Sequence, residues 1–314
     1  MVCPTTRISV PASIANLGPG LDTLALAVRL FLHLRVRKSR QPGSNLLHFH
    51  FRNIELQGEN LIERAFRHLA ARRRFPSVDV EVETEVPLCS GLGSSAAAVA
   101  AGFRLFEALF GPQPIEKLLA AGCAIEGHPE NVAAALLGGL VVCCQRDDGT
   151  VIALPAPWPR SLRIIVATPE MQLETRRSRA ILPQTVPLSA AVSNIQRIAL
   201  LLAGLRTRNY AVLSEALRDQ LHQPSRCAIV PALDRLLELR HTGLIGVCLS
   251  GSGPSVAAVA QSHLRQISAL LADTFRKAGV RAVTRTLSVY QCDGPVMTKT
   301  SRRALPRRPP AEIV

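Results

Sequence analysis

The chain has 314 residues, of which 47% are hydrophobic, 19% are charged and 4% are aromatic. This length suits one large domain or two ordinary ones, and the apolar content is ample for packed cores. The formal net charge of +14 suggests a nucleic-acid partner, but the basic residues are spread out and no binding motif is visible. We therefore expect no nucleic-acid partner. A positive field would equally attract anionic nucleotides.

The eight cysteines show no spacing typical of a zinc site, which favours buried free thiols in a reducing cytosol. No signal peptide is expected, because Pro4 and the polar residues 5–7 stand where an apolar segment would be needed. The longest apolar run, residues 133–144, is shorter than the roughly 20 residues that span a bilayer. These features predict a cytoplasmic protein with no membrane association.

In the first half of the chain, apolar alternation predicts strands, and runs of good helix formers predict helices. Residues 12–22 form a Gly-Pro-Gly loop that presents Asn16 and Asp22, or simply a turn into the next strand. Asn60 is expected to cap a helix. The predicted strands cover 7–11, 24–36, 46–54 and 78–86, the predicted helices cover 60–71, 96–110 and 115–125, and a hairpin covers 140–154.

The second half follows a proline-rich link at residues 155–159. From residue 293 onward, arginine, lysine and proline dominate, which predicts a disordered basic tail. Between the link and the tail we predict strands over 162–168, 246–249 and 280–289 and helices over 189–205, 210–221, 230–242 and 264–278.

The most informative stretch is the glycine-rich segment 87–97, which lies between a predicted strand and a predicted helix. Gly91 and Gly93 permit a tight backbone, and Ser94 and Ser95 stand where a helix N-cap belongs. A helix N-terminus suits a phosphate group. No lysine follows the glycines, so the loop is not a P-loop of the Walker type. On its own, a serine-capped glycine turn is an equally ordinary explanation.

This segment resembles the Pro-x-x-x-Gly-Leu-Gly-Ser-Ser-Ala-Ala phosphate loop of the GHMP small-molecule kinases. Residues 12–22 and 126–139 resemble two motifs of homoserine kinases within that superfamily. Residues 250–256 match its third motif, which by this resemblance is expected to support the phosphate loop from behind. Two stretches, Thr175–Arg179 and Asp219–Arg226, also resemble homoserine kinases. Three departures from the usual motifs are Leu21 for phenylalanine, Glu130 for aspartate and Ala134 for proline.

The resemblance implies an α+β fold with two GHMP kinase domains. Residues 1–157 would form an ATP-binding domain similar to ribosomal protein S5, and residues 158–292 a ferredoxin-like domain, with 293–314 as the tail. It also implies ATP-dependent phosphorylation of L-homoserine to O-phospho-L-homoserine, a step toward threonine, with Mg²⁺ as cofactor. Relatives are often homodimers, so a homodimer is a further expectation.

The resemblance assigns candidate residues to four roles. Catalysis is expected to depend on Asn131 and Asp22 through positioning and charge neutralisation, although Glu130 is an open alternative as a base. Mg²⁺ is expected at Ser95 and Glu126, with Ser94 next. The substrate is expected to contact Asn16, Asp22, His128, Thr175, Arg179, Arg226 and Gly251. ATP is expected to contact Asn60 and Pro87, Leu88, Cys89, Ser90, Gly91, Leu92, Gly93, Ser94, Ser95, Ala96 and Ala97.

Three alternative functions stay open at this point. The first is a GHMP kinase that acts on another small alcohol, such as a mevalonate-type acid. The second is a catalytically silent GHMP fold that serves as a binding module. A basic nucleic-acid binder working through the tail is the third. Intact Gly91, Gly93, Ser95, Glu126 and Asn131 argue against a silent fold.

Overall fold

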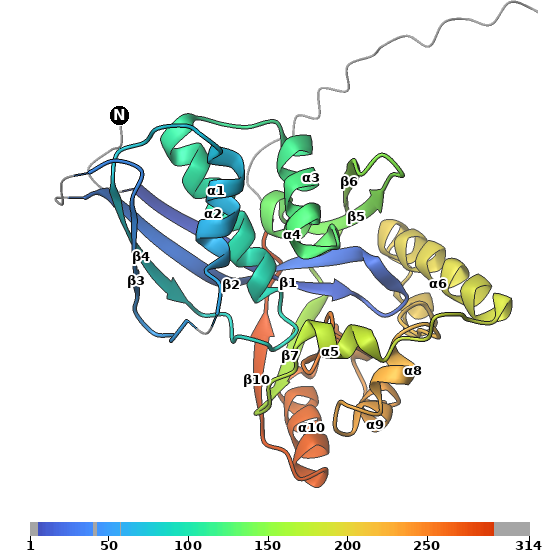
Figure 1. Cartoon of the computed structure of the whole chain (residues 1–314). Coiled ribbons are helices and arrows are strands. Elements are labelled where there is room, and N and C mark those ends of the chain that lie inside the picture. The colour runs from blue at the N-terminus through green and yellow to red at the C-terminus, as the bar shows by residue number, and fades with distance from the viewer. Residues whose placement is uncertain (1–5, 40–42, 57, 292–314) are drawn as a thin grey trace, which may run out of the picture.

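A long antiparallel hairpin formed by β1 (Thr6–Asn16) and β2 (Gly20–Lys38) runs through the centre of the molecule (Figure 1). The computed structural model describes residues 6–39, 43–56 and 58–291. One end of β2 pairs with β4 (Val78–Thr84) and the other end pairs with β5 (Leu140–Gln145). The hairpin therefore spans the first sheet, and its buried side chains also pack against β7 and α6 of the second half of the chain.

The first sheet has six strands, in the order β3-β4-β2-β5-β6 with β1 paired to β2. Helices α1 to α4 lie on one face of this sheet (Figure 1). Buried aliphatic and aromatic side chains fill the space between them, because every strand and helix turns an apolar face inward. The remaining elements are β3 (Leu47–Phe51), β6 (Val151–Ala156), α1 (Leu61–Ala70), α2 (Ser94–Phe110), α3 (Ile115–Glu126) and α4 (Glu130–Leu137).

The second sheet has four antiparallel strands in the order β10-β7-β9-β8. With strands and helices alternating as β-α-β-β-α-β, this is the ferredoxin-like arrangement expected from the sequence. The expected α+β fold with two different sheets is therefore confirmed. The strands are β7 (Arg163–Pro169), β8 (Leu244–Leu249), β9 (Val256–Ala260) and β10 (Ala282–Leu287). The helices are α5 (Thr175–Ala180), α6 (Leu188–Thr207), η1 (Tyr210–Val212), α7 (Leu213–Ala216), α8 (Gln223–Arg226), α9 (Leu233–Leu237) and α10 (Leu264–Lys277).

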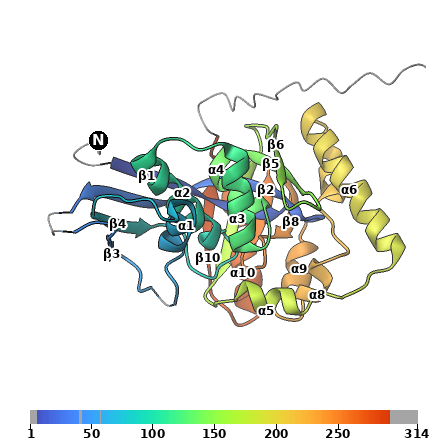
Figure 2. The ribbon, with the colours of Figure 1, turned by 45° about the horizontal axis from the view of Figure 1, so that its top comes forward.

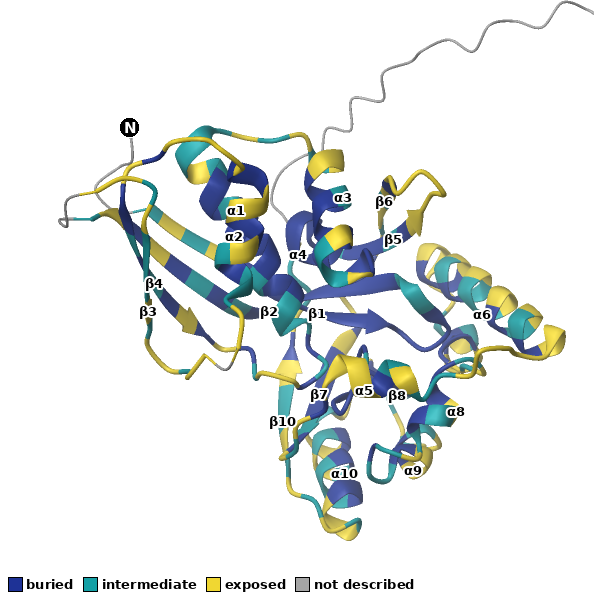
Figure 3. Ribbon diagram, viewed as in Figure 1, coloured by how far each residue is buried: buried dark blue, intermediate teal, exposed yellow. Residues whose placement is uncertain are grey.

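The two sheets share one hydrophobic core cluster. It joins β1 and β2 residues such as Ile14 and Leu26 to Ile164 of β7 and to Leu201 of α6. Figure 3 shows that buried residues continue from the hairpin into the lower half of the molecule. The predicted domain boundary at residues 157/158 falls inside this shared region and stays a prediction.

Several predicted elements differ from the observed ones. The predicted helix over 210–221 is reduced to η1 and α7, and the helix over 230–242 to α9. Strand β9 and helix α5 were not predicted from the sequence. Asn60 does cap α1, because its Oδ1 accepts from the N–H groups of Ile62 and Glu63. The predicted tail, residues 293–314, lies outside the described residues.

The molecular surface differs from the sequence expectations in its cysteines and in helix α6. Cys89 and Cys144 are exposed, so the prediction of uniformly buried thiols is wrong, although all six cysteines of the described chain are free. Helix α6, which stands out from the body in Figure 2, is long and apolar enough to cross a membrane by length and composition. It is only partly buried: Leu201 and Leu205 join the shared core, whereas Leu188 and Ile195 are exposed.

Candidate active site

A cavity of about 330 Å³ lies where the N-terminus of α2 faces α5 and α8. Its wall comes from both halves of the chain, and the bond from Asn16 Nδ2 to the Gly251 carbonyl joins residues 235 positions apart. Most predicted site residues line it: Asn16, Asp22, Cys89, Gly91, Gly93, Ser94, Ser95, Ala96, Glu126, His128, Asn131, Thr175, Arg179, Arg226 and Gly251.

The N-terminus of α2 faces this cavity without a side-chain cap. The N-cap residue is Gly93, at φ +69°, and no acidic residue lies in the first turn. The prediction that Ser94 and Ser95 cap the helix is therefore wrong: they are its first two residues. Uncapped N–H groups and the positive end of the helix dipole suit an anionic ligand.

The loop before α2 is supported from behind by the third motif. Ser250 Oγ donates to the Gly91 carbonyl at 2.7 Å, and the Ser255 N–H donates to the Ser90 carbonyl at 3.1 Å. A Cβ at Gly91 would lie 2.4 Å from the Ser250 carbonyl oxygen, so only glycine allows this approach. The sequence expectation that the third motif supports the loop is confirmed.

Ser95 and Glu126 place two hard oxygen ligands at the edge of the cavity. Ser95 Oγ donates to Glu126 Oε1 at 2.5 Å. Within the described residues no cluster of three or more histidine, cysteine, aspartate or glutamate side chains is suited to hold a metal ion. A Mg²⁺ ion bound together with nucleotide phosphates needs only one or two protein carboxylates or hydroxyls, so this pair fits such an ion.

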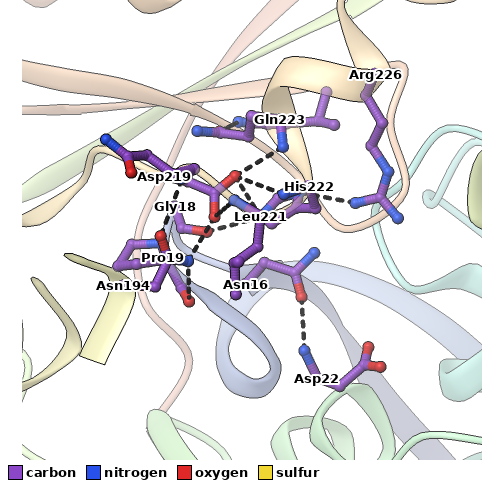
Figure 4. Close-up of polar contacts among 12 residues, drawn as sticks. Asn16, Gly18, Pro19, Asp22, Asn194, Asp219, Leu221, His222, Gln223 and Arg226 are labelled. Carbon is purple, nitrogen blue, oxygen red and sulfur yellow. Dashed lines mark hydrogen bonds and ion pairs between the residues drawn. The ribbon is translucent and has the colours of Figure 1, made fainter. Parts of the chain in front are cut away.

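The loop that joins β1 to β2 has a strained backbone at the cavity. Asn16, Leu17 and Asp22 have φ angles of +73°, +45° and +54°, which L-residues adopt rarely. Asn16 holds the loop: its Oδ1 accepts from the Asp22 N–H (Figure 4), and its Nδ2 donates to the Gly251 carbonyl. These two hydrogen bonds hold the backbone in this conformation, which presents the Asp22 carboxylate to the cavity.

Asp22 pairs with Arg179 across the cavity. Arg179 Nη2 donates to Asp22 Oδ1 at 2.6 Å and Nη1 donates to Oδ2 at 3.0 Å. This bond raises the pKa of Arg179, so its guanidinium stays charged. Thr175 lies one helical turn before Arg179 on α5, and its Oγ1 is 3.2 Å from Ser252 Oγ.

Arg226 is a second cation of the site, and it is only 1% exposed. Its Nη1 donates to His222 Nδ1 at 2.8 Å (Figure 4) and to the Gly251 carbonyl at 3.1 Å. Burial and the neighbouring Arg179 lower the pKa of Arg226 to about 10, which leaves it charged at neutral pH. Because Arg226 only donates, His222 Nδ1 must accept, and its Nε2–H donates to the Gly18 carbonyl at 2.7 Å.

Asp219 organises the start of α8 behind Arg226. Its carboxylate accepts from the N–H groups of Leu221, His222 and Gln223 and from Asn194 Nδ2 (Figure 4). Asp219 and His222 therefore act on the site through Arg226, whereas Gln223 Oε1 accepts from the Leu249 N–H at 2.7 Å and ties α8 to β8.

Asn131, Glu130 and His128 form a buried polar group on the cavity wall. Asn131 Nδ2 donates to Glu130 Oε1 at 2.8 Å, and His128 Nδ1 lies 3.1 Å from the same oxygen. Burial alone would lower the pKa of His128, but the contact with Glu130 and its charge outweigh burial and raise that pKa. Glu130 is 1% exposed, and its Oε2 has no hydrogen-bond partner among the described residues.

A second cavity, of about 830 Å³, adjoins the first and shares Leu61, Cys89, Ser94 and Ser95 with it. Asn60, Pro87 and Leu88 line only this second cavity. Ser90, Leu92 and Ala97 line neither, since their side chains are buried. They can act only through backbone groups.

The sequence reasoning missed Ser13. It is fully buried on β1, and its Oγ donates to Asn131 Oδ1 at 2.7 Å. The available signal was a hydroxyl inside the otherwise apolar run Val10–Ala15, since buried polar groups need a partner.

The fold and the site define a kinase of the GHMP class. Residues 60–139 match the model for the GHMP kinases N terminal domain, and residues 201–277 match the model for GHMP kinases C terminal. A homoserine kinase of Solibacter usitatus is 36% identical over 287 residues, which cover 90% of this chain and 94% of that protein.

One solved structure agrees with this homoserine kinase, and a second supports the fold. The crystal structure of homoserine kinase from Cytophaga hutchinsonii matches with a TM-score of 0.81 and 25% identity, over 93% of this chain and 96% of that one. L. major mevalonate kinase in complex with R-mevalonate matches with a TM-score of 0.67 and 16% identity, over 93% and 98%, which supports the fold alone. The chain belongs to the homoserine kinase family.

Proposed function

We propose that this protein transfers the γ-phosphoryl group of ATP to the side-chain hydroxyl of L-homoserine, giving ADP and O-phospho-L-homoserine, a step toward threonine. The observation that carries this proposal is the cavity itself. One end offers an uncapped helix N-terminus for phosphates, and the other offers the Asp22–Arg179 pair beside Arg226 for a zwitterion. Family membership supports the same reaction.

On the donor side, backbone N–H groups of residues 90–95 and the N-terminus of α2 hold the phosphates of ATP. The adjoining cavity of about 830 Å³, lined by Asn60, Pro87 and Leu88, is large enough for the nucleoside part. Because the Asn60 Oδ1 already accepts two backbone bonds at the start of α1, its contribution to that cavity is mainly to fix the wall.

Ser95 and Glu126 are the residues that would hold Mg²⁺ at the phosphates. The bound ion would neutralise charge on the transferring phosphoryl group. The side chains themselves fix the distance between the start of α2 and the end of α3, which sets the width of the donor site.

On the acceptor side, the two guanidinium groups of Arg179 and Arg226 bind the homoserine carboxylate, and Asp22 binds its ammonium. Asn16 and Gly251 shape this end through their mutual hydrogen bond, and His128 and Thr175 border it. In the structure Arg179 and Asp22 pair with each other. When the zwitterion binds, this ion pair is replaced by two: ammonium with Asp22, and carboxylate with the arginines.

Asn131 lies between the two ends, 3.1 Å from the position that a Cβ of residue 93 would occupy. We assign it to positioning the acceptor hydroxyl beside the γ-phosphate. The hydroxyl proton passes to a phosphate oxygen or to water, so catalysis comes from positioning and charge neutralisation.

The protein is proposed to act in the cytoplasm, as a homodimer, without nucleic-acid or membrane partners. One assay tests the reaction: the wild-type protein is incubated with ATP, Mg²⁺ and either L-homoserine or mevalonate, and phosphate esters are followed by phosphorus NMR. We expect O-phospho-L-homoserine and no phosphomevalonate. Phosphomevalonate without O-phospho-L-homoserine would assign the chain to mevalonate as its alcohol substrate. Failure to form ADP with either alcohol would contradict the proposed reaction.

A further inference from the structure

Asn131 is held at both ends of its side-chain amide by buried groups. Its Oδ1 accepts from Ser13 Oγ at 2.7 Å, and its Nδ2 donates to Glu130 Oε1 at 2.8 Å. Ser13 and Glu130 are at most 1% exposed, and Asn131 is 8% exposed. Water therefore does not compete for these bonds, and the amide has one orientation.

The orientation of the amide follows from the chemistry of its neighbours. The Nδ2 end donates to Glu130 Oε1, which accepts through an oxygen lone pair. The Oδ1 end then faces Ser13, whose hydroxyl must donate. An amide has two lone pairs and two N–H groups, so each end of Asn131 keeps one site for a substrate group.

Ser13 also contacts the phosphate loop. Its backbone N–H donates to the Leu92 carbonyl at 3.1 Å, and a Cβ at residue 93 would lie 2.2 Å from Ser13 Oγ. Gly93 thus leaves room for the hydroxyl that binds Asn131. One residue of β1 touches the donor loop through its backbone and Asn131 through its side chain.

From these contacts we infer that Ser13 is a positioning residue, which holds the Asn131 amide in register with the phosphate loop while Glu130 holds the opposite end. This inference rests on the proposed function, in which Asn131 places the acceptor hydroxyl against the phosphate that the loop binds. The Ser13 side chain does not line the cavity, so its hydroxyl acts on the reaction only through Asn131.

The test is a double-mutant cycle on kcat. Ser13→Ala removes only the hydroxyl, and alanine fits a strand position that pairs with Ala27. We expect Ser13→Ala to lower kcat about 30-fold while KM for ATP and homoserine stays within about threefold, because a small misplacement of reacting groups costs rate more than binding. In an Asn131→Ala background, Ser13→Ala should change kcat by less than about twofold.

Ser9→Ala is the matched control. Ser9 lies on the same strand, and its Oγ is hydrogen-bonded to His33 Nδ1 at 2.8 Å on the exposed face, away from the cavity. It should leave kcat unchanged. Circular dichroism and ATP affinity verify that every variant is folded.

The outcomes separate the inference from the proposed reaction. Equal losses from Ser13→Ala in the wild-type and Asn131→Ala backgrounds would overturn the inference, as would a folded Ser13→Ala with normal kcat. A wild-type protein that leaves homoserine unphosphorylated would contradict the proposed reaction instead, and the same cycle would then be measured on the alcohol that the enzyme does phosphorylate.

Discussion

Asp22 and Arg179 lie 157 positions apart in the chain and form a two-pronged ion pair across the cavity, with N–O distances of 2.6 and 3.0 Å. Their side chains are 36% and 35% exposed, so the pair is accessible to a ligand. An amino acid carries one ammonium and one carboxylate, and the pair offers a partner to each. Under the proposed function, these charges compensate each other in the free enzyme until a zwitterion separates them.

Arg179→Ala should raise KM for homoserine about 100-fold, because the loss of a charged hydrogen-bonded contact costs about 3 kcal/mol. KM for ATP should stay within about threefold. Initial rates at varied homoserine and varied ATP measure both constants. Arg177→Ala is the matched control, since Arg177 is exposed on the same helix and does not line the cavity. An effect confined to ATP would contradict the assignment of Arg179 to the acceptor.

Glu130→Gln tests whether the reaction uses a protein base. Gln keeps an acceptor oxygen for Asn131 Nδ2 but cannot take a proton, so kcat should fall by no more than about tenfold. Asn131→Ala should cost about 100-fold or more, because it removes the positioning group. If Glu130→Gln abolishes turnover while ATP still binds to the folded protein, Glu130 is the base and the proposal of catalysis without a protein base is wrong.

Local patterns in the sequence were sufficient for the phosphate loop and for the Asn16–Asp22 loop. In both, glycines stand between elements whose periodicity is clear, so the direction of the backbone follows from nearby residues. Pairing between distant residues has no such signal. Ser13 and Asn131 are 118 positions apart, and nothing in either neighbourhood specifies the other.

The failed helix prediction over residues 210–221 has a physical cause in Asp219. Residues 210–221 have good helical periodicity, but the Asp219 carboxylate binds the N–H groups of residues 221–223 and starts the separate turn of α8. Strand β9 was missed for another reason: its sequence, Val256–Ala260, is buried throughout and rich in alanine, so it shows neither alternation nor strong β propensity.

Ser95→Ala and Glu126→Gln should each raise the Mg²⁺ concentration for half-maximal activity by about tenfold, since alanine removes the proposed hydroxyl ligand and glutamine replaces the charged carboxylate by a neutral amide. Activity measured against Mg²⁺ at a fixed, saturating ATP concentration gives this value. Ser94→Ala is the informative comparison, because Ser94 lines the same cavity on the adjacent residue of α2. A shift with Ser94→Ala but not with Ser95→Ala would mean that the ligand assignment is wrong.

Deleting residues 295–314 should leave kcat and both KM values within about twofold, because all residues that line the two cavities lie between positions 16 and 252. Steady-state kinetics of the shortened chain give the answer. A large loss of kinase activity would mean that the tail contributes to the reaction. A nucleic-acid affinity lost with the tail would support the alternative of a nucleic-acid binder.

His222 should make stability depend on pH in a defined direction. Burial lowers the pKa of His222, and this effect outweighs the Asp219 carboxylate 3.7 Å away. Below the unfolded-state pKa of about 6.5 the unfolded chain binds a proton that the folded protein resists. The stabilisation is therefore present above this pH and is lost as pH falls, by up to about 1.4 kcal/mol per pH unit.

His222→Gln should remove this slope, because glutamine also offers an acceptor and a donor but does not titrate. The free energy of unfolding from urea titrations between about pH 5 and pH 7 measures the slope in both proteins. Contributions from His128 and from carboxylates are common to both and cancel in the comparison. Identical slopes in the two proteins would show that His222 binds a proton as readily in the folded state as in the unfolded chain, which would contradict the neutral tautomer that holds Arg226 in place.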